Sequence, residues 1–212
     1  MGDPAAVTPV AGTPTGTESR SAAEPKGFGG KAWFWWPWPL LVLADLWSKH
    51  AVFAFLERLA VERGNSSTPE NYRPPYPVFD GLLRFDLVTW GNTGTIWGLG
   101  KDFPIPLMVL RCGAVLGLFW FVRGTPRAWR LQQFVLSLIL AGALGNLYDN
   151  FTRADRSVRD FLFFTFHWPV EYPFPAFNVA DSCITVGAIM LLIMLWRQDA
   201  VANASSHRTP KA

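Results

Sequence analysis

Four long apolar runs constrain this chain more than any other feature of its sequence. Each approaches the roughly 20 residues that an α-helix needs to cross the hydrocarbon core of a bilayer. Half of the residues are apolar and only 17% are charged, whereas soluble domains carry roughly 25% charged residues. The chain is therefore predicted to be a mainly α-helical integral membrane protein with four transmembrane helices. The predicted helices are 40–59, 104–122, 131–147 and 177–196.

The segments outside these runs differ in composition and divide the chain. Residues 1–30 are rich in small and polar residues, cannot bury enough apolar surface to offset the entropy of ordering, and are predicted to be a disordered cytoplasmic tail. Residues 31–199 form the predicted four-helix membrane domain, and residues 200–212 a cytoplasmic C-terminal tail. Within the membrane domain, a Pro-rich loop at 64–77 precedes the segment 78–103, where apolar and polar residues alternate. That alternation predicts a small extracytoplasmic β-rich cradle.

The distribution of basic residues predicts the orientation of the helices. The short turn between the second and third helices contains Arg123, Arg127 and Arg130 and no acidic residue, and basic residues also flank both ends of the membrane domain. Cytoplasmic loops carry an excess of Lys and Arg. Both termini and this turn are therefore predicted to be cytoplasmic, with the β-rich segment and residues 149–175 outside.

Polar residues inside the apolar runs identify the candidate functional site. Charged side chains in a membrane segment are costly, so they are functional candidates by default. Helical spacing places them on common faces of the first, third and fourth helices, and one further Asp enters an apolar run at the outer surface. They are Asp45 and Lys49, then Gly142, Asn146 and Asp149, then Asn178, Asp181 and Ser182, and finally Asp160.

Simpler explanations exist for several of these residues. Asn146 would, as most membrane Asn residues do, hydrogen-bond to a neighbouring helix. Asn178 or Asp181 would cap the first turns of the fourth helix. Asp160 would form a salt bridge with Arg156 or Arg159.

Taken together, the polar faces favour a pair of carboxyl groups, Asp160 and Asp181, at one membrane surface. Two adjacent carboxyls cannot both ionise cheaply, so they share one proton. The ionised member can take a proton from water while the protonated member polarises a carbonyl group, which is peptide hydrolysis of the aspartic type. A proton- or ion-coupled transporter uses the same kind of carboxylates and is the alternative. The isolated His residues predict no metal site, and the small net charge of +3 without a basic stripe predicts no nucleic-acid binding.

The same residues resemble the motifs of the bacterial lipoprotein signal peptidases, also called signal peptidase II. The resemblance covers roughly residues 45–196. The motifs are Asp45-Leu46-Trp47-Ser48-Lys49, Asn92-Thr93-Gly94, the run from Gly142 to Asp149, Asp160-Phe161, and the run from Phe177 to Ser182. One departure is Asn150, because the family usually has Arg at that position.

This resemblance implies an aspartyl endopeptidase of the bacterial cytoplasmic membrane that cuts diacylglyceryl-modified prolipoproteins just before the lipidated Cys. It makes Asp160 and Asp181 the catalytic dyad, and Asn92, Asn146 and Asn178 supporting residues. It implies no cofactor, a monomer in contact with membrane lipid, and inhibition by globomycin-type compounds. A non-catalytic relative that binds lipoproteins is a further alternative, suggested by Asn150.

Overall fold

The computed structural model describes residues 27–65, 67–94 and 104–206, and within these ranges the protein is mainly helical. The helices are α1 Ala32–Trp35, α2 Pro37–Glu62, α3 Pro104–Gly124, α4 Arg130–Thr152 and α5 Val179–Ser206. Four helical stretches are long and apolar enough to cross a membrane: 32–62, 105–124, 130–152 and 179–198. The prediction of four membrane helices is therefore confirmed.

The helix ends differ from the predicted ones by several residues. Helix α2 begins at Pro37, which occupies the first turn where the missing N–H of proline is harmless. Helix α5 continues to Ser206, ten residues beyond the predicted Trp196 and into the segment predicted as a C-terminal tail. The predicted N-terminal tail lies almost wholly outside the described residues.

Helix α4 is the central helix of the bundle. In its membrane-spanning window 67% of the residues are buried, against 11–17% for the other three spans, and it packs against α2, α3 and α5. The apolar core includes Phe34 of α1, Val122 of α3, and Leu136 and Leu140 of α4 itself. The outer faces of the other helices expose large apolar side chains, as helices in contact with lipid do. Examples are Leu40, Trp47, Leu116, Trp120 and Leu192.

A four-stranded antiparallel sheet lies at one end of the bundle. Its strands, in spatial as well as sequence order, are β1 Tyr76–Phe79, β2 Leu83–Asn92, β3 Val158–Phe166 and β4 Tyr172–Pro173. Strand β2 and the second half of β1 lie in the region 78–103 that was predicted to be β-rich, whereas the first half of β1 lies in the predicted Pro-rich loop. Residues 95–103 of the predicted region fall outside the described residues. Strands β3 and β4 were not predicted from the sequence.

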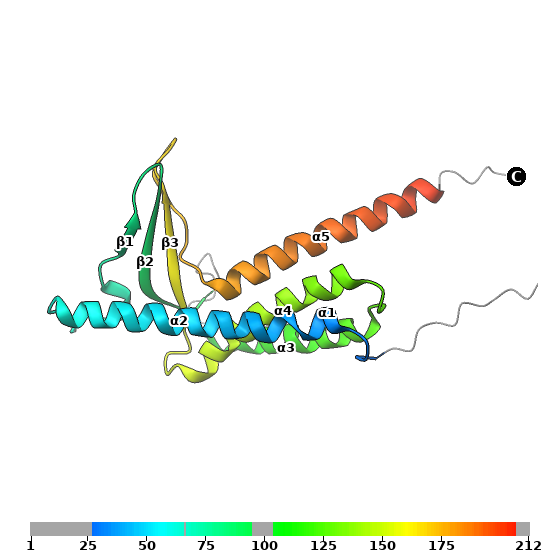
Figure 1. Ribbon diagram of the computed structural model, residues 1–212, viewed down its shortest axis with the longest axis horizontal. Helices are drawn as coiled ribbons and strands as arrows, with labels where there is room; N and C mark the ends of the chain where they lie inside the picture. Colours follow the sequence, from blue (N-terminus) through cyan, green and yellow to red (C-terminus); the bar gives the residue numbers. More distant parts are fainter. Residues whose placement is uncertain (1–26, 66, 95–103, 207–212) are drawn as a thin grey trace, which may run out of the picture.

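The sheet and the basic turn lie at opposite ends of the helices. In Figure 1 the sheet rises where α3 begins, α4 ends and α5 starts, while the turn joining α3 to α4 lies at the far end. The described end of α5 lies toward that same far end (Figure 1). The polar segments on the two sides of the bundle are thus separated by the length of the apolar helices.

Candidate active site

Strand β3 places Asp160 beside the end of β2. The β2–β3 register pairs Asp160 with Trp90 and Val158 with Asn92, after an irregularity between Leu87 and Trp90. The Asn92 side chain donates from Nδ2 to Asp160 Oδ2 at 3.1 Å, and its Oδ1 accepts the Gly94 N–H at 2.9 Å. The turn that ends β2 therefore orients an amide donor toward the Asp160 carboxylate.

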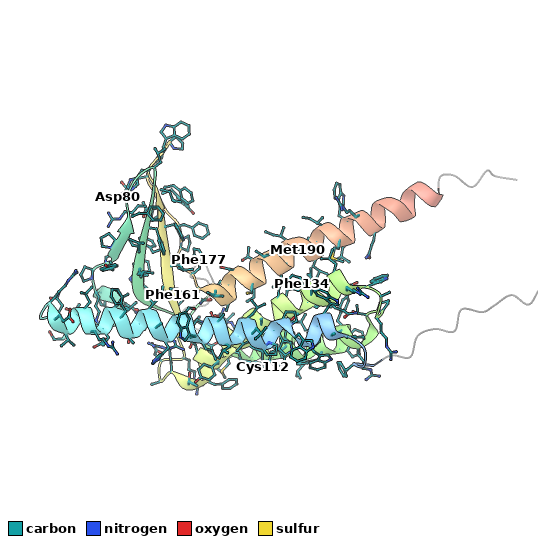
Figure 2. All side chains as sticks on the ribbon, viewed as in Figure 1. Asp80, Cys112, Phe134, Phe161, Phe177 and Met190 are labelled. Atoms are coloured by element: carbon teal, nitrogen blue, oxygen red, sulfur yellow. The ribbon has the colours of Figure 1, made fainter. Side chains whose placement is uncertain are left out.

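The segment before α5 brings the helix start to the same carboxylate. Phe177 pairs with Leu162 of β3: the Leu162 N–H donates to the Phe177 carbonyl at 2.9 Å and the Phe177 N–H to the Leu162 carbonyl at 3.0 Å. Figure 2 shows Phe161 and Phe177 at the foot of the sheet, close to the start of α5. The next residue, Asn178, donates from Nδ2 to Asp160 Oδ1 at 2.7 Å.

Asn178 and Asp181 cap the first turn of α5 reciprocally. The Asp181 N–H donates to Asn178 Oδ1 at 2.9 Å, and the Asn178 N–H donates to Asp181 Oδ2 at 3.2 Å. This is a capping box, in which the side chains satisfy two N–H groups that the helix leaves unpaired. The predicted capping role of Asp181 is correct, but its Oδ1 also accepts from Asn146 Nδ2 at 2.8 Å. Because Asn178 contacts both Asp160 and Asp181, the two carboxyl groups are neighbours.

The environment of Asp160 favours its protonated form. The residue is 2% exposed, and burial together with the neighbouring Asp181 carboxylate raises the pKa of Asp160 to about 8, although the Asn92 and Asn178 hydrogen bonds oppose this. Asp181 is less enclosed than Asp160. The two groups thus have the features of a carboxyl pair that retains a proton near neutral pH.

The simpler explanation of Asp160, a salt bridge with Arg156 or Arg159, does not hold among the described residues. Arg159 instead donates from Nη2 to Asp149 Oδ1 at 2.6 Å. Successive side chains of a strand point to opposite faces, so Arg159 and Asp160 of β3 cannot face each other. Arg156 contacts the Asn150 carbonyl and the Met108 sulfur.

Next to the Asp160–Asp181 pair lies a charged cluster that consists of Asp45, Lys49, Asp149 and Arg159. The Lys49 ammonium lies 2.7 Å from Asp45 Oδ2 and 3.2 Å from Asp149 Oδ2, and three of the four side chains are at most 1% exposed. Asp45 Oδ1 also accepts the Ala180 N–H of α5 at 2.9 Å. The cluster therefore joins α2, α4, β3 and α5.

Asn146 connects the charged cluster with the Asp160–Asp181 pair. Its Oδ1 accepts from Lys49 Nζ at 3.1 Å and from Asn178 Nδ2 at 3.2 Å, while its Nδ2 donates to Asp181. The expected bonds between helices are present, and they end on the candidate site. The sequence motif therefore places one amide where it can orient three functional groups.

Gly142 and Ser182 contribute to the site by packing and by local bonding. A Cβ atom on Gly142 would lie 2.2 Å from the Ala180 carbonyl oxygen, so only glycine allows this approach of α4 to α5. The Ser182 hydroxyl donates to the Asn178 carbonyl at 3.1 Å, within its own helix. Ser182 therefore shares the helix face of the site, but its hydroxyl bonds to the residue that caps its own helix.

One further residue at the site, Arg111, was not predicted. Arg111 of α3 donates from Nη1 to the Asn150 side chain, and its charge interacts with those of Asp160 and Asp181. Its sequence signal was available, because Arg111 is the one charged residue in the apolar run 104–122. In the described part of the chain, no group of three His, Cys, Asp or Glu side chains could hold a metal ion.

The chain is similar to known membrane enzymes over most of its length. The profile of the family Signal peptidase (SPase) II matches residues 39–197. The lipoprotein signal peptidase of Syntrophotalea carbinolica is 40% identical over 116 residues, which cover 53% of this chain and 69% of the relative. That of Chlamydia trachomatis serovar L2 is 36% identical over 118 residues, covering 55% and 68%. A solved bacterial membrane enzyme shares the fold with a TM-score of 0.58 and 22% identity, covering 82% of this chain and 90% of its own.

Proposed function

Because the chain belongs to the signal peptidase II family, we propose that Asp160 and Asp181 form the catalytic dyad of a prolipoprotein signal peptidase. The observation that carries this proposal is the shared partner Asn178, which hydrogen-bonds to both carboxyl groups. The substrate is a diacylglyceryl-modified prolipoprotein, cut just before its lipidated Cys. The location of the two groups, where the sheet meets the start of α5, suits a substrate whose lipid remains in the membrane.

The proposed reaction needs one water molecule and one proton on the dyad. The ionised carboxylate takes a proton from the water as its oxygen attacks the scissile carbonyl carbon, while the protonated carboxyl donates a hydrogen bond to the carbonyl oxygen. Collapse of the tetrahedral intermediate breaks the C–N bond, and the dyad returns a proton to the leaving nitrogen. A coupled pair titrates as a unit, so the acid and base roles are assigned to the pair.

The remaining polar residues have supporting roles in this proposal. Asn92, Asn146 and Asn178 hold the carboxyl groups through amide donors. The pairing of Lys49 with Asp45 and Asp149 fixes the helices that carry these amides.

We further propose that the site faces the outer side of the bacterial cytoplasmic membrane, with both termini and the basic turn 123–130 in the cytoplasm. The separation of that turn from the sheet supports this orientation (Figure 1). The family membership also supports the proposals that the enzyme works as a monomer on the outer leaflet and that globomycin-type compounds inhibit it.

The deciding experiment supplies the purified full chain in lipid nanodiscs with a diacylglyceryl-modified precursor and follows cleavage by mass spectrometry. Asp160→Asn and Asp181→Asn should each reduce kcat/KM by at least about 10²-fold, the scale of acid–base contributions. The matched control is Asp80→Asn, on the exposed loop between β1 and β2 (Figure 2), which should change the rate by no more than about twofold.

The outcomes separate the competing interpretations. Cleavage by the parent protein would exclude the non-catalytic relative. Parent-like rates in both Asn variants would overturn the assignment of the dyad. Ion flux without cleavage would favour the transporter.

A further inference from the structure

Arg111 is a cation in a helix that is otherwise apolar from Pro104 to Val122. Its side chain is fixed from two sides: Nη1 donates to Asn150 Oδ1, and Nη2 lies 3.4 Å from the Gly94 carbonyl oxygen. The Asn150 amide is itself held, because its Nδ2 donates to the Arg156 carbonyl. A charge retained in a membrane helix and held in one position calls for a functional explanation.

The charges around the dyad show what this guanidinium does. In the charged cluster, the positive charges of Lys49 and Arg159 balance the negative charges of Asp45 and Asp149. Among the described residues, no salt bridge joins a cation to Asp160 or Asp181. Outside this cluster, the charge of Arg111 interacts with those of both dyad carboxyls, which makes three interacting ionisable groups.

These three groups are neutral together when the dyad carries one proton. With one carboxylate ionised, its negative charge equals the positive charge of Arg111. The guanidinium lies close to the dyad through the turn that ends β2, because it contacts the Gly94 carbonyl, and the Asn92 side chain that accepts the Gly94 N–H also donates to Asp160. Without Arg111, neutrality would require a proton on each carboxyl, and no carboxylate would remain to activate water. Burial of an unbalanced charge is strongly unfavourable, so the cation influences which protonation state dominates.

We propose that Arg111 is the counter-charge of the dyad: held by Asn150, it keeps one of the two carboxyl groups ionised. This rests on the proposed function of Asp160 and Asp181. Arg111 is a positioning residue in this role, because it acts through the charge of the dyad. It also gives Asn150 a role, since the amide that replaces the usual arginine orients an arginine from another helix.

The other groups that face the dyad are amides, or ions already paired within the charged cluster. These groups are Asn92 of β2, Asp45 and Lys49 of α2, Asn146 of α4, and Asn178, which directly precedes α5. The positive charge of Lys49 also acts on both dyad carboxyls, but this ammonium is already in direct contact with the Asp45 and Asp149 carboxylates. Arg156, the other cation at Asn150, contacts the Asn150 carbonyl and the Met108 sulfur.

The test measures protonation directly in the full chain in lipid nanodiscs. Infrared spectroscopy follows the carboxylic-acid C=O band as a function of pH, and the part of the band lost in Asp160→Asn and Asp181→Asn belongs to the dyad. In Arg111→Gln the midpoint of this band should move to higher pH by about 1 unit, because an adjacent cation favours the ionised form. The acidic limb of the kcat/KM profile should move in the same direction.

Two variants separate charge from structure. Arg111→Lys retains the cation and should leave the midpoint within about 0.5 unit of the parent value. Arg123→Gln removes a cation from the far end of the same helix and should leave it within about 0.2 unit, because distant charges are screened. If Arg111→Gln yields too little folded protein, Asn150→Ala releases the guanidinium and should shift the midpoint upward by a smaller amount.

The proposal fails if the midpoint of folded Arg111→Gln, or of Asn150→Ala in its place, coincides with that of the parent. A purely structural Arg111 would lower stability and leave the midpoint unchanged. The infrared measurement does not depend on turnover. A parent protein that does not cut the precursor would therefore refute the proposed function while the band shift still decides the role of Arg111.

Discussion

Two pairs of acidic residues lie in the same polar core but have different partners. Asp45 and Asp149 contact the cations Lys49 and Arg159. Asp160 and Asp181, in contrast, accept hydrogen bonds from the amides of Asn92, Asn146 and Asn178. All four are acidic side chains held among membrane helices, so their location alone does not distinguish them.

The difference in partners gives the two pairs different chemistry. A cation in direct contact stabilises the ionised carboxylate and holds the elements it joins. Amide donors orient a carboxyl group without supplying a full charge, so burial and the neighbouring carboxylate can raise its proton affinity. In this protein the partners of the first pair therefore suit a structural role, and those of the second pair suit the proton exchange proposed for the dyad.

The largest difference between the two pairs is expected when the Lys49 cation is removed from the charged cluster. Lys49→Met should lower the free energy of unfolding by about 3–5 kcal/mol, because it leaves the buried Asp45 carboxylate without a cation and removes one of the two cations that contact Asp149. Asp160→Asn loses only hydrogen bonds to amides and should change stability by no more than about 1 kcal/mol. Equilibrium unfolding in detergent measures both. Equal destabilisation by the two substitutions would contradict the division into structural and reactive pairs.

The close contact between α4 and α5 offers a smaller perturbation of both pairs. Gly142→Ala places a methyl group against the Ala180 carbonyl and should cost about 1–3 kcal/mol of stability through overpacking. It should also reduce turnover, because Asn146 and Asp181 lie on the helices that would separate. The matched control is Gly113→Ala on α3, where a Cβ would meet no atom within 4 Å. Similar behaviour of the two variants would show that the helix contact is unimportant.

The pH dependence of cleavage tests whether the Asp160–Asp181 pair needs its proton. The pKa of Asp160 is raised to about 8, so increasing the pH through this value removes the proton that the dyad needs. Above about pH 8, kcat/KM should therefore fall, approaching tenfold per pH unit as a single ionisation requires. A profile that remains flat to pH 10 would show that the proton is not needed.

The smallest effect is expected at Ser182, which shares a helix face with Asp181 but bonds to the Asn178 carbonyl of its own helix. Ser182→Ala should change stability by less than about 0.5 kcal/mol and the cleavage rate by no more than about twofold. Parallel measurements with Asp181→Asn provide the comparison. A large loss in Ser182→Ala would place its hydroxyl among the working groups of the site.

Much of the architecture could be predicted from single segments of the chain. Apolar runs of membrane-spanning length determine four helices, and alternation from Leu83 to Leu87 indicates the strand β2. Strand β3 was missed because Phe161 to Phe164 form a continuous apolar stretch, whose periodicity does not distinguish a strand from other buried segments. Its pairing with β2 and Phe177 depends on residues distant in the sequence.

In the candidate site, too, single segments predicted some features, whereas others depend on residues distant in the sequence. Asp160 and Asp181 were predicted because polar residues in apolar runs must be buried together and must find partners. Their actual partners were only partly predictable. Helical spacing placed Asn146 on one face with Asp149, and Asn178 on one face with Asp181. Arg111, in contrast, is the one charged residue in its apolar run, so spacing gave it no partner.

The sequence by itself determined that this chain crosses a membrane and that its intramembrane acids must converge, since isolated charges are too costly in lipid. Tertiary structure alone decided which acid receives which partner. The alternation of β3 directs Arg159 to Asp149 and leaves Asp160 to amides, and the approach of α3 brings Arg111 to Asn150. Side-chain direction and helix packing, rather than proximity along the chain, therefore separate the carboxylates that contact cations from those that accept hydrogen bonds from amides.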